Sequence, residues 1–575
     1  MPRRSAWLCP VRRSLLPALI LAMLFAGPAA ATFSLSSTPD WESNPNNLYG
    51  TGFAVGDLDR DGWVDLVVAN GNDMARQNVA VYRNQGDGTY AAAPTWTSQD
   101  VDYHGHLDLA DVDGDGALDC AVAVYLGSGG FSQPGRVKLY KGNGDGTFSA
   151  TPVWQSAESF YCFSCAFGDV DNDGRPDLAC ATGEDYNGNP ERRRLFRNVG
   201  GALETMPSWM SSEIEYSLDV TWADFNNDGW LDLAFAGSSG PNRVYFNEEG
   251  TLEPSAGWSS GDASLYANTA AAGDYDADGW VDLAIADNNQ LGGSGHFKVY
   301  RNAGGTLGAT PIWQSAQTGY GSHVSWIDLD EDGDLDLATG MWWGPVRIYE
   351  NLGGALATSP AFTTATSSVI ENEVWEDVDN DGLQAALDAT WTASGSRKLF
   401  TLPQRPVREI VSLTVDGVPV DPDQIELDAD DAWIVLPSAP PVGASVRAIY
   451  VSSADIDLAL SNWDPSEGEY LFLNHRDPSL VAELAPIGTI RLLVSPNPSS
   501  GAATILLEGV GAAEADGSLE LLDVQGRRIR SWTAGASTLS WDGADRGGRR
   551  LAAGVYWLRW TAPSGQAAAV RVIRR

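Results

Sequence analysis

The sequence predicts an all-β protein: a β-propeller of seven blades, with eight as the alternative, followed by a smaller β-sandwich. Three observations lead to this fold class. An aspartate-rich motif recurs seven times at intervals near fifty residues, which is typical of propeller blades or solenoid turns. Short apolar runs rich in valine, alanine and isoleucine follow the first six copies and are too short for typical helices. The 62 glycines and 22 tryptophans among 575 residues indicate many turns and much aromatic packing.

Each repeat carries the signals of four short strands. One strand precedes the aspartate motif, and a second, such as "VDLVVAN" at 64–70, follows it. A third runs into an Asn/Gly turn, as in "VYRNQGDGTY", and a fourth carries a Pro/Trp element such as "TPVW". Four antiparallel strands per repeat make a propeller blade, and closing the ring removes most exposed sheet edges.

A small all-β insertion interrupts the predicted propeller. Residues 404–450 alternate apolar and polar residues around a "VDGV" hairpin signal. We therefore expect the propeller at 32–403, the insertion at 404–450, and the final blade strands with a linker at 451–487.

The N-terminus is expected to close the ring. Residues 37–43, "STPDWES", resemble the Pro/Trp strands, whereas 455–474 resemble a second and third strand with no Pro/Trp strand after them. One final blade shared by both ends gives seven blades. In the alternative, 377–402 and 451–475 are two separate degenerate units, which gives eight.

The charge and the first residues predict an exported protein. The formal charge of −40 and a pI near 4.2 disfavour nucleic acid as a partner and favour cations. Residues 1–31 hold four arginines, a short apolar core and small residues, which indicates a signal peptide cleaved between Ala31 and Thr32. The apolar stretch is short for a membrane span, so we expect a secreted or outer-surface protein with no transmembrane segment after cleavage.

Four cysteines remain in the mature chain: Cys120, Cys162, Cys165 and Cys180. An even number in an oxidising compartment allows disulfides, and Cys165 with Cys180 is the first choice. The "CFSC" pair has no second Cys or His pair at zinc spacing, so we interpret these cysteines as structural.

The aspartate motif predicts calcium loops. Ca²⁺ takes six to eight oxygen ligands, and Asp-x-Asp-x-Asp-Gly supplies three carboxylates at alternate positions before a sharp turn. An EF-hand would need a Glu at position twelve, where these loops have Val68, Val122 or Cys180. We expect the Asp at position nine to close the site and the seventh residue, such as Trp63 or Arg175, to add its carbonyl.

The alternative reading of one such loop is an acidic, solvated turn, because Asp and Gly are common turn residues. Seven copies in the same phase favour metal, because three or four carboxylates crowded in each loop repel one another without a cation. The predicted ligands are Asp57, Asp59, Asp61 and Asp65; Asp111, Asp113, Asp115 and Asp119; Asp169, Asp171, Asp173 and Asp177; Asp224, Asn226, Asp228 and Asp232; Asp274, Asp276, Asp278 and Asp282; Asp328, Asp330, Asp332 and Asp336; and Asp377, Asp379 and Asp381.

These residues resemble the FG-GAP or VCBS-type repeat, the calcium-binding blade of the integrin α-subunit propeller. "CAFGDVDNDGRPDLACAT" carries the phenylalanine, the Gly-Asp pair and the whole loop. The resemblance implies calcium at the first, third, fifth and ninth loop positions. Six sites are complete, whereas the seventh has Ala385 in place of the ninth-position acid.

The C-terminal residues 488–575 carry a second resemblance. "VSPNPSSGAATILLEG", "LLDVQGRRIRSW" and "VRVIRR" resemble the FlgD Ig-like fold and the related C-terminal sorting domain of type IX secretion. About six short alternating strands with Gly turns are typical of a small β-sandwich. The resemblance implies that secretion machinery recognises this domain.

We expect a non-catalytic, calcium-stabilised binding or adhesion module whose partner is an extracellular protein or a glycan, an argument that rests largely on the resemblance. The alternative is a calcium-dependent polysaccharide lyase or another carbohydrate-active enzyme. A lyase needs a base, and His106 and His323 share the same offset from their loops, so they could face the central channel together. We assign no catalytic residue.

Overall fold

The computed structural model contains strands, turns and loops, and no helix among the residues it describes is long and apolar enough to cross a membrane. It describes residues 33–44, 47–262, 266–289, 295–330, 332–380, 382, 385–395, 397–420, 425–428, 432–453, 455–475, 491–495, 503–508, 518–523, 528–533, 538–541, 543–544, 546, 549–551, 554–561 and 567–574. The predicted signal peptide and Asp381 lie outside these residues.

The repeats fold into antiparallel sheets of four main strands, numbered here along the chain. Sheets 1 to 3 contain β2 (Gly50–Gly56), β3 (Asp65–Asn70), β4 (Val79–Tyr82) and β5 (Trp96–Thr97); β6 (Tyr103–Ala110), β7 (Asp119–Gly127), β9 (Val137–Tyr140) and β10 (Trp154–Gln155), with β8 (Gly130–Pro134) on β7; and β11 (Cys162–Gly168), β12 (Asp177–Thr182), β13 (Arg194–Phe196) and β14 (Trp209–Met210).

The next three sheets repeat this order. Sheets 4 to 6 contain β15 (Tyr216–Ala223), β16 (Asp232–Ser238), β17 (Arg243–Tyr245) and β20 (Trp258–Ser259), with the hairpin β18 (Asn247–Glu248) and β19 (Thr251–Leu252); β21 (Ala267–Gly273), β22 (Asp282–Asp287), β23 (Phe297–Tyr300) and β24 (Trp313–Gln314); and β25 (Tyr320–Ile327), β26 (Asp336–Gly344), β27 (Arg347–Tyr349) and β28 (Phe362–Thr363).

Sheet 7 combines both ends of the propeller sequence. It contains β29 (Ser368–Glu376), β37 (Asp457–Asn462), β38 (Tyr470–Phe472) and β1 (Trp41–Glu42). Trp41 pairs with Leu471, so the N-terminal strand lies on the outer edge of the last sheet, as its Pro/Trp signal predicts. β26 also pairs with β29, which joins sheets 6 and 7.

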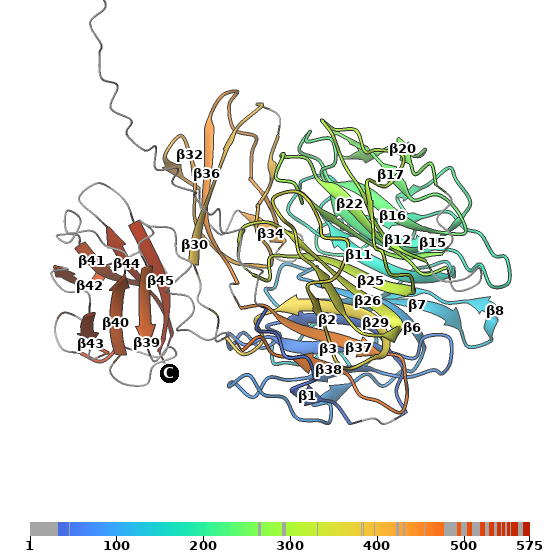
Figure 1. Cartoon of the computed structure of the whole chain (residues 1–575), viewed down its shortest axis with the longest axis horizontal. Helices are drawn as coiled ribbons and strands as arrows, with labels where there is room; N and C mark the ends of the chain where they lie inside the picture. Colours follow the sequence, from blue (N-terminus) through green and yellow to red (C-terminus); the bar gives the residue numbers. More distant parts are fainter. Residues whose placement is uncertain are drawn as a thin grey trace, which may run out of the picture. The chain divides into compact units, whose positions relative to one another are not determined.

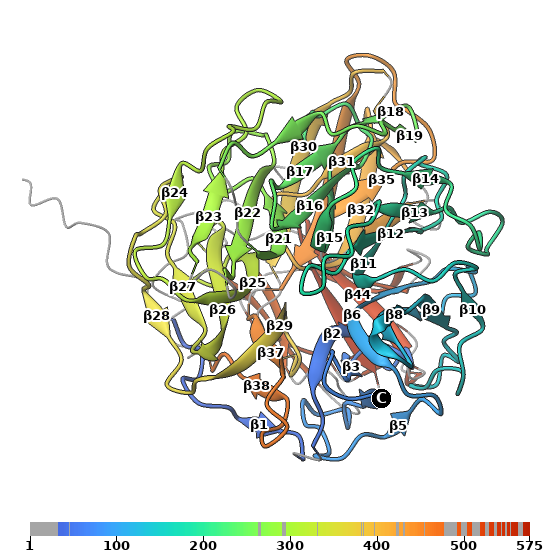
Figure 2. The same ribbon diagram turned by 90° about the vertical axis from the view of Figure 1, so that its right-hand side faces the viewer.

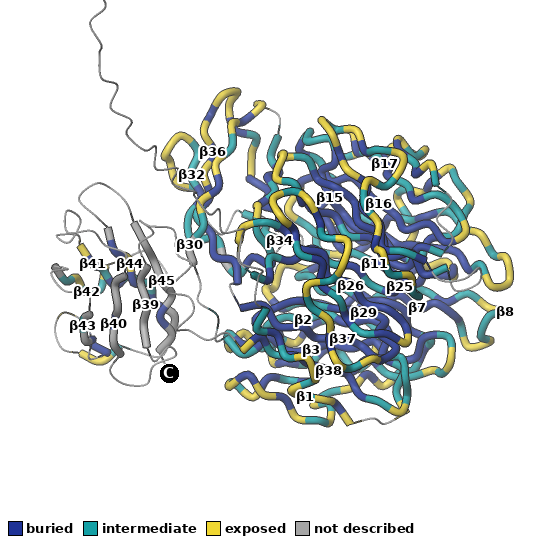
Figure 3. Tube along the Cα trace, viewed as in Figure 1, coloured by how far each residue is buried: buried dark blue, intermediate teal, exposed yellow. Residues whose placement is uncertain are grey.

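The sheets close into a β-propeller. The first strand of each sheet contacts the first strand of the next, in the order β2, β6, β11, β15, β21, β25 and β29, and β29 contacts β2 again. Figure 2 shows the sheets fanned around a central axis with these strands innermost. Figure 3 shows the inner strands as the buried part of the propeller.

The Pro/Trp strands explain much of the aromatic packing between sheets. Trp96 of sheet 1 packs edge to face on Phe148 of sheet 2, with ring centroids 5.6 Å apart. Trp209 of sheet 3 packs on Tyr245 of sheet 4 in the same way at 5.2 Å. These outer tryptophans therefore fill the space between neighbouring sheets, and the edge-to-face contact is a favourable aromatic geometry.

The insertion begins earlier than the predicted boundary at residue 404. β30 (Ala385–Thr392) pairs with β36 (Ser445–Ser452) instead of β29, and β36 also pairs with β32 (Val407–Val415), which carries β33 (Val418–Pro419). A second small sheet joins β31 (Leu399–Thr401), β35 (Trp433–Val435) and β34 (Glu426–Asp428). The insertion therefore starts directly after the seventh aspartate loop (Figure 1).

The C-terminal residues form two further sheets. One contains β39 (Arg491–Ser495), β40 (Ala503–Glu508) and β43 (Thr538–Trp541). The other contains β42 (Arg528–Thr533), β41 (Ser518–Asp523), β44 (Gly554–Thr561) and β45 (Ala567–Arg574). A buried cluster that includes Leu521, Trp541 and Trp560 joins strands of both sheets.

The described cysteines are buried free thiols: Cys120, Cys162, Cys165 and Cys180. Cys165 and Cys180 lie directly opposite each other in the β11–β12 pair, but no disulfide joins them. The predicted pair is therefore adjacent and unbonded.

Candidate metal centres and the central channel

In sheets 1 to 6 the aspartate loop connects the innermost strand to the second strand, and in sheet 7 it leads from β29 into the insertion. In five of the described loops, three carboxylates offer oxygens that lie within 4.8 Å of one another, close enough to hold one metal ion. These groups are Asp57, Asp59 and Asp61; Asp111, Asp113 and Asp115; Asp169, Asp171 and Asp177; Asp274, Asp276 and Asp282; and Asp328, Asp330 and Asp332. The structure thus brings three of the predicted ligands together in each of these five loops.

The loop backbone is organised around the first aspartate. In the third loop, Asp169 accepts hydrogen bonds from the backbone N–H groups of Asp173 at 3.0 Å and Gly174 at 2.8 Å. Gly174 has φ of 82°, a left-handed conformation that favours glycine. This turn aims the alternate carboxylates at one point, which is how a short loop can surround a cation.

The aspartate that closes each loop is buried and accepts hydrogen bonds from the backbone. Asp177 accepts the N–H of Val170 at 3.0 Å with one oxygen and the N–H of Asn198 at 2.7 Å with the other. The side chain of Asn198 then donates to the backbone carbonyl of Val112, in the loop of the preceding sheet, at 2.8 Å. The same side-chain bond to the preceding loop is made by Asn84, Asn247, Asn302 and Asn351, whereas sheet 2 has Gly142 at this position. The loops therefore tie most neighbouring sheets together as well as gathering carboxylates.

The seventh loop is also closed by an aspartate, which corrects the prediction that it lacks one. Asp457 begins β37, pairs with Glu376 as Asp65 pairs with Gly56, and is 1% exposed. It accepts the N–H groups of Val378 at 2.9 Å and Asn474 at 2.7 Å. The insertion therefore separates this ligand-type carboxylate from its loop in sequence and not in space.

Basic side chains pair with several loops. A lysine or arginine at the end of the third strand contacts loop carboxylates in four sheets: Arg83 with Asp59, Lys141 with Asp113 and Asp115, Arg197 with Asp171, and Arg301 with Asp276 and Asp278. The equivalent residue of sheet 6 is Glu350. The ion pairs of the described residues join no lysine or arginine to Asp328, Asp330, Asp332 or Asp336.

The protonation behaviour of the loops reflects this crowding. Burial raises the pKa of Asp336 to about 9 and that of Asp328 to about 8, and neighbouring carboxylates add to both shifts. Burial and the charge of Asp332 raise the pKa of Asp330 to about 6, and Glu350 adds a smaller contribution. Burial and like charges both disfavour ionised carboxylates, and a bound cation reverses that preference.

The insertion supplies cations to three other loops. Arg408 lies 2.8 Å from Glu376 and 3.3 Å from Asp377 at the seventh loop. Arg397 lies 3.5 Å from Asp224 of the fourth loop, where Asn226 replaces an acid. Lys398 donates to the carbonyl of Asn172 in the third loop at 2.7 Å. These contacts hold the insertion against the loop end of the propeller.

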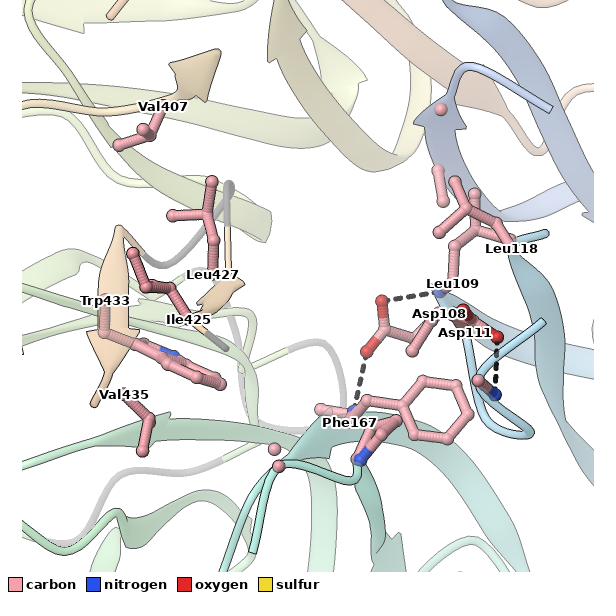
Figure 4. A pocket seen from close by; sticks show the side chains of 18 of the residues that line it. Asp108, Leu109, Asp111, Leu118, Phe167, Val407, Ile425, Leu427, Trp433 and Val435 are labelled. Atoms are coloured by element: carbon pink, nitrogen blue, oxygen red, sulfur yellow. Dashed lines mark hydrogen bonds between the residues drawn. The ribbon is translucent and has the colours of Figure 1, made fainter. Parts of the chain in front are cut away.

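A chamber of about 1270 Å³ lies between the insertion and sheets 1 to 3. Figure 4 shows its two walls. Val407, Ile425, Leu427, Trp433 and Val435 of the insertion form an apolar wall, which faces Asp108, Leu109, Asp111, Leu118 and Phe167 of the propeller. Asp108 accepts the N–H of Phe167 at 2.7 Å, so this carboxylate is fixed to the neighbouring sheet.

The opposite mouth of the channel is aromatic and amide-rich. A narrow cavity of about 40 Å³ is lined by Asn72, Asp73, Tyr125, Phe163, Asp185, Tyr186, Leu218, Ser238, Tyr266, Asn268, Asn288, Trp342, Glu371 and Trp463. Among the described residues, Asn288, Asp73 and the indole nitrogen of Trp463 have buried polar atoms without a hydrogen-bond partner. Buried polar atoms of this kind call for a ligand or water.

The two histidines predicted to share the channel do lie near each other. Burial lowers the pKa of His323 to about 3, and the nearby His106 lowers it further. His106 Nδ1 lies 3.7 Å from Asp219, an acid that the spacing argument did not single out. The sequence does hold a signal for Asp219: it lies five residues before the first aspartate of its loop, as His106 and His323 do.

Comparison with known proteins agrees with the repeat pattern. Residues 57–122, 123–180, 224–285 and 274–339 match a family model described as an FG-GAP-like repeat. The fold and the matches together define a β-propeller built with FG-GAP-like repeats. No curated protein sequence matches the chain.

Two solved structures resemble the chain weakly. One is the crystal structure of BBS1N in complex with ARL6DN, soaked with mercury, at 11% identity and a TM-score of 0.39; the similarity covers 78% of this chain and 96% of that one. The other is the same complex soaked with lead, at 13% identity and a TM-score of 0.37, covering 56% and 88%.

Proposed function

We propose that this protein is an exported, calcium-stabilised propeller that binds an extracellular glycan without catalysis, and that residues 488–575 serve as its sorting domain. Export is supported by the signal-like residues 1–31 and by FG-GAP-like repeats, which are typical of extracellular proteins. Calcium is supported by the clustered loop carboxylates, whose oxygen-only donor sets suit a hard cation.

The observation that carries glycan binding is the aromatic row at the mouth opposite the loops. Trp343 is 62% exposed and packs edge to face against both Tyr320 and Trp342, and Trp342 packs against Trp463. Trp343 has φ of 55°, which is a genuine outlier for so bulky a residue and a feature that clusters at ligand sites. An exposed tryptophan face beside unpartnered amides and carboxyls suits a sugar ring.

The size of the cavity limits how the ligand is held. About 40 Å³ admits a hydroxyl-bearing substituent and not a whole ring. The sugar ring would therefore lie on Trp343 at the surface and project one substituent toward Asn288 and Glu371. Burial raises the pKa of Glu371 to about 8, so at neutral pH its protonated carboxyl can donate a hydrogen bond to a sugar hydroxyl.

A polysaccharide lyase is the second candidate, because Asp219 could orient His106 as a base. Both residues lie inside the channel between the two mouths, where a polymer would have to thread the propeller. This position favours the non-catalytic proposal. Incubation with acidic polysaccharides and absorbance from unsaturated products tests it, and product formation that His106→Ala abolishes would establish the lyase.

A glycan array probed with the full chain in calcium tests the binding proposal. We expect at least one glycan to bind, with the affinity reduced tenfold or more in Trp343→Ala. Met210→Ala, which truncates another exposed apolar side chain on the outer strand β14, should bind as the wild type does. Absence of any bound glycan, or equal binding by Trp343→Ala, would overturn the proposal.

A further inference from the structure

The innermost strands share a feature at one height of the channel. A register shift typical of a β-bulge occurs in each of them, at or next to the residue five positions before the aspartate loop. Bulges bend a strand and re-aim a side chain. The residues at this position form what we call the bulge ring: Gly52, His106, Ser164, Asp219, Thr269, His323 and Asn372.

The bulge ring is polar and narrow. Asp219 of sheet 4 lies 3.7 Å from the Nδ1 atom of His106, which belongs to sheet 2, and accepts a 2.6 Å hydrogen bond from the hydroxyl of Ser164 in the sheet between them. Side chains from sheets two positions apart therefore meet across the channel. His323 stands at the same position of the ring in sheet 6, where the hydroxyl of Ser325 lies 3.4 Å from its Nδ1 atom.

Two members of the ring carry buried polar atoms with no hydrogen-bond partner among the described residues. They are the Nε2 atom of His106, which is 4% exposed, and the hydroxyl of Thr269, which is 1% exposed. An imidazole binds metal in its neutral form, through a nitrogen that carries no proton. His106 has a ligand-capable nitrogen that nothing in the described protein occupies.

The surroundings also hold these groups in place. The ring of Phe163 packs 5.1 Å from that of His106 and limits its rotation. The second oxygen of Asp219 accepts the backbone N–H of Ala270 at 3.0 Å. Outer partners that orient an imidazole and a carboxylate in this way are typical of metal sites.

We propose that the bulge ring binds one divalent transition-metal ion of the zinc type through the imidazoles of His106 and His323 and the carboxylate of Asp219. Two imidazoles with one carboxylate suit zinc and its neighbours, whereas the oxygen-only aspartate loops suit calcium. The site is separate from the loops and from the glycan mouth, so it does not depend on the proposed function. A ring of trapped water that satisfies the same polar atoms is the competing description.

Metal content and cobalt spectroscopy decide between them. The full chain is equilibrated with Zn²⁺ in a large excess of Ca²⁺, dialysed and measured by mass spectrometry, and Co²⁺ is then added in the same buffer. We expect one retained zinc per chain and an intense visible absorption from cobalt held by nitrogen and carboxylate ligands. Loop-bound cobalt in oxygen-only sites would absorb only weakly.

Variants assign the signal, because the chain has five histidines in all. His106→Ala, His323→Ala and Asp219→Asn should each weaken zinc binding at least a hundredfold, whereas His296→Ala and His475→Ala should not change it. Thermal midpoints in calcium show whether each variant folds. If His106→Ala does not fold, the test relies on His323→Ala, because His323 is only half-buried. Wild-type chain that retains no zinc, or His323→Ala chain that retains it fully, would overturn the proposal and leave water in the ring.

Discussion

Asp457 accepts the backbone N–H of Val378 at 2.9 Å, although 79 residues separate the two along the chain. Asp177 makes the same bond to Val170, only seven residues away. The insertion has thus been placed inside the hairpin that joins a loop to its closing strand, and the seventh loop keeps the arrangement of the other six. Its closing carboxylate comes from the far side of the insertion.

Asp457→Asn should destabilise the protein in calcium by about 2 kcal/mol, because an amide nitrogen would replace an oxygen that accepts a buried N–H. The variant should also bind one calcium ion fewer than the wild type. Denaturant unfolding and metal analysis measure the two effects. Glu158→Gln, an exposed change away from the loops, is the control, and a wild-type calcium count in Asp457→Asn would contradict the assignment.

Glu350→Arg should reduce the dependence of the protein on calcium. The substitution gives the sixth loop the basic partner that Arg83 and Arg301 supply to the first and fifth loops. In excess chelator we expect stabilisation of about 1 kcal/mol, seen as a higher thermal midpoint, with little change in calcium. Glu158→Arg makes the same change in net charge elsewhere. An equal rise in that control would assign the effect to net charge alone.

The stability of the metal-free protein should fall as the pH rises. Burial raises the pKa of Asp119 to about 6, Asp65 to about 7 and Asp336 to about 9, all above the ordinary value of 3.8. A raised pKa means that the folded chain binds the proton more tightly than the unfolded chain, so ionisation between pH 4 and 9 disfavours folding. Calcium favours the ionised form and should oppose this trend.

Thermal midpoints from pH 5 to 9, with chelator and with calcium, measure this effect. We expect the difference between the two conditions to widen as the pH rises. A metal-free midpoint that rises over this range would show that the loop carboxylates do not control stability.

Arg408→Met should cost about 3 kcal/mol, because it leaves Glu376 and Asp377 buried without their guanidinium partner. Part of the loss should be recovered in calcium, which can neutralise the seventh loop instead. Arg447→Met is the matched control, since its pair with Asp388 in the same insertion is exposed and contributes 1 kcal/mol or less. Chemical denaturation measures the loss of stability in both variants, and equal losses would contradict the role assigned to Arg408.

The sequence predicts the repeat, the aspartates that cluster in the loops and the N-terminal closing strand, because each depends on local spacing. Asp457 was missed because the insertion breaks the spacing, yet "IDLALS" at 456–461 does align with "VDLVVA" at 64–69. Contacts such as Arg408 with Asp377 depend on how the insertion folds back, and no local pattern encodes them. The start of the insertion at residue 385 was missed for the same reason.

The channel was predicted in part. His106 and His323 stand out because histidine is rare in this chain, whereas Asp219 is one of many acids and draws no attention. Asp219 matters because it lies at a β-bulge and contacts His106, and a bulge has no clear sequence signal here. The unpartnered atoms at the aromatic mouth likewise come together only when the sheets are assembled around the channel.

The most direct test of the account measures bound calcium and the thermal midpoint of the full chain together, before and after excess chelator. We expect about seven calcium ions per chain, one for each loop, and a substantially lower midpoint once they are removed. A chain that binds no calcium, with the same midpoint in chelator, would contradict the central claim that cations in the aspartate loops hold the propeller together.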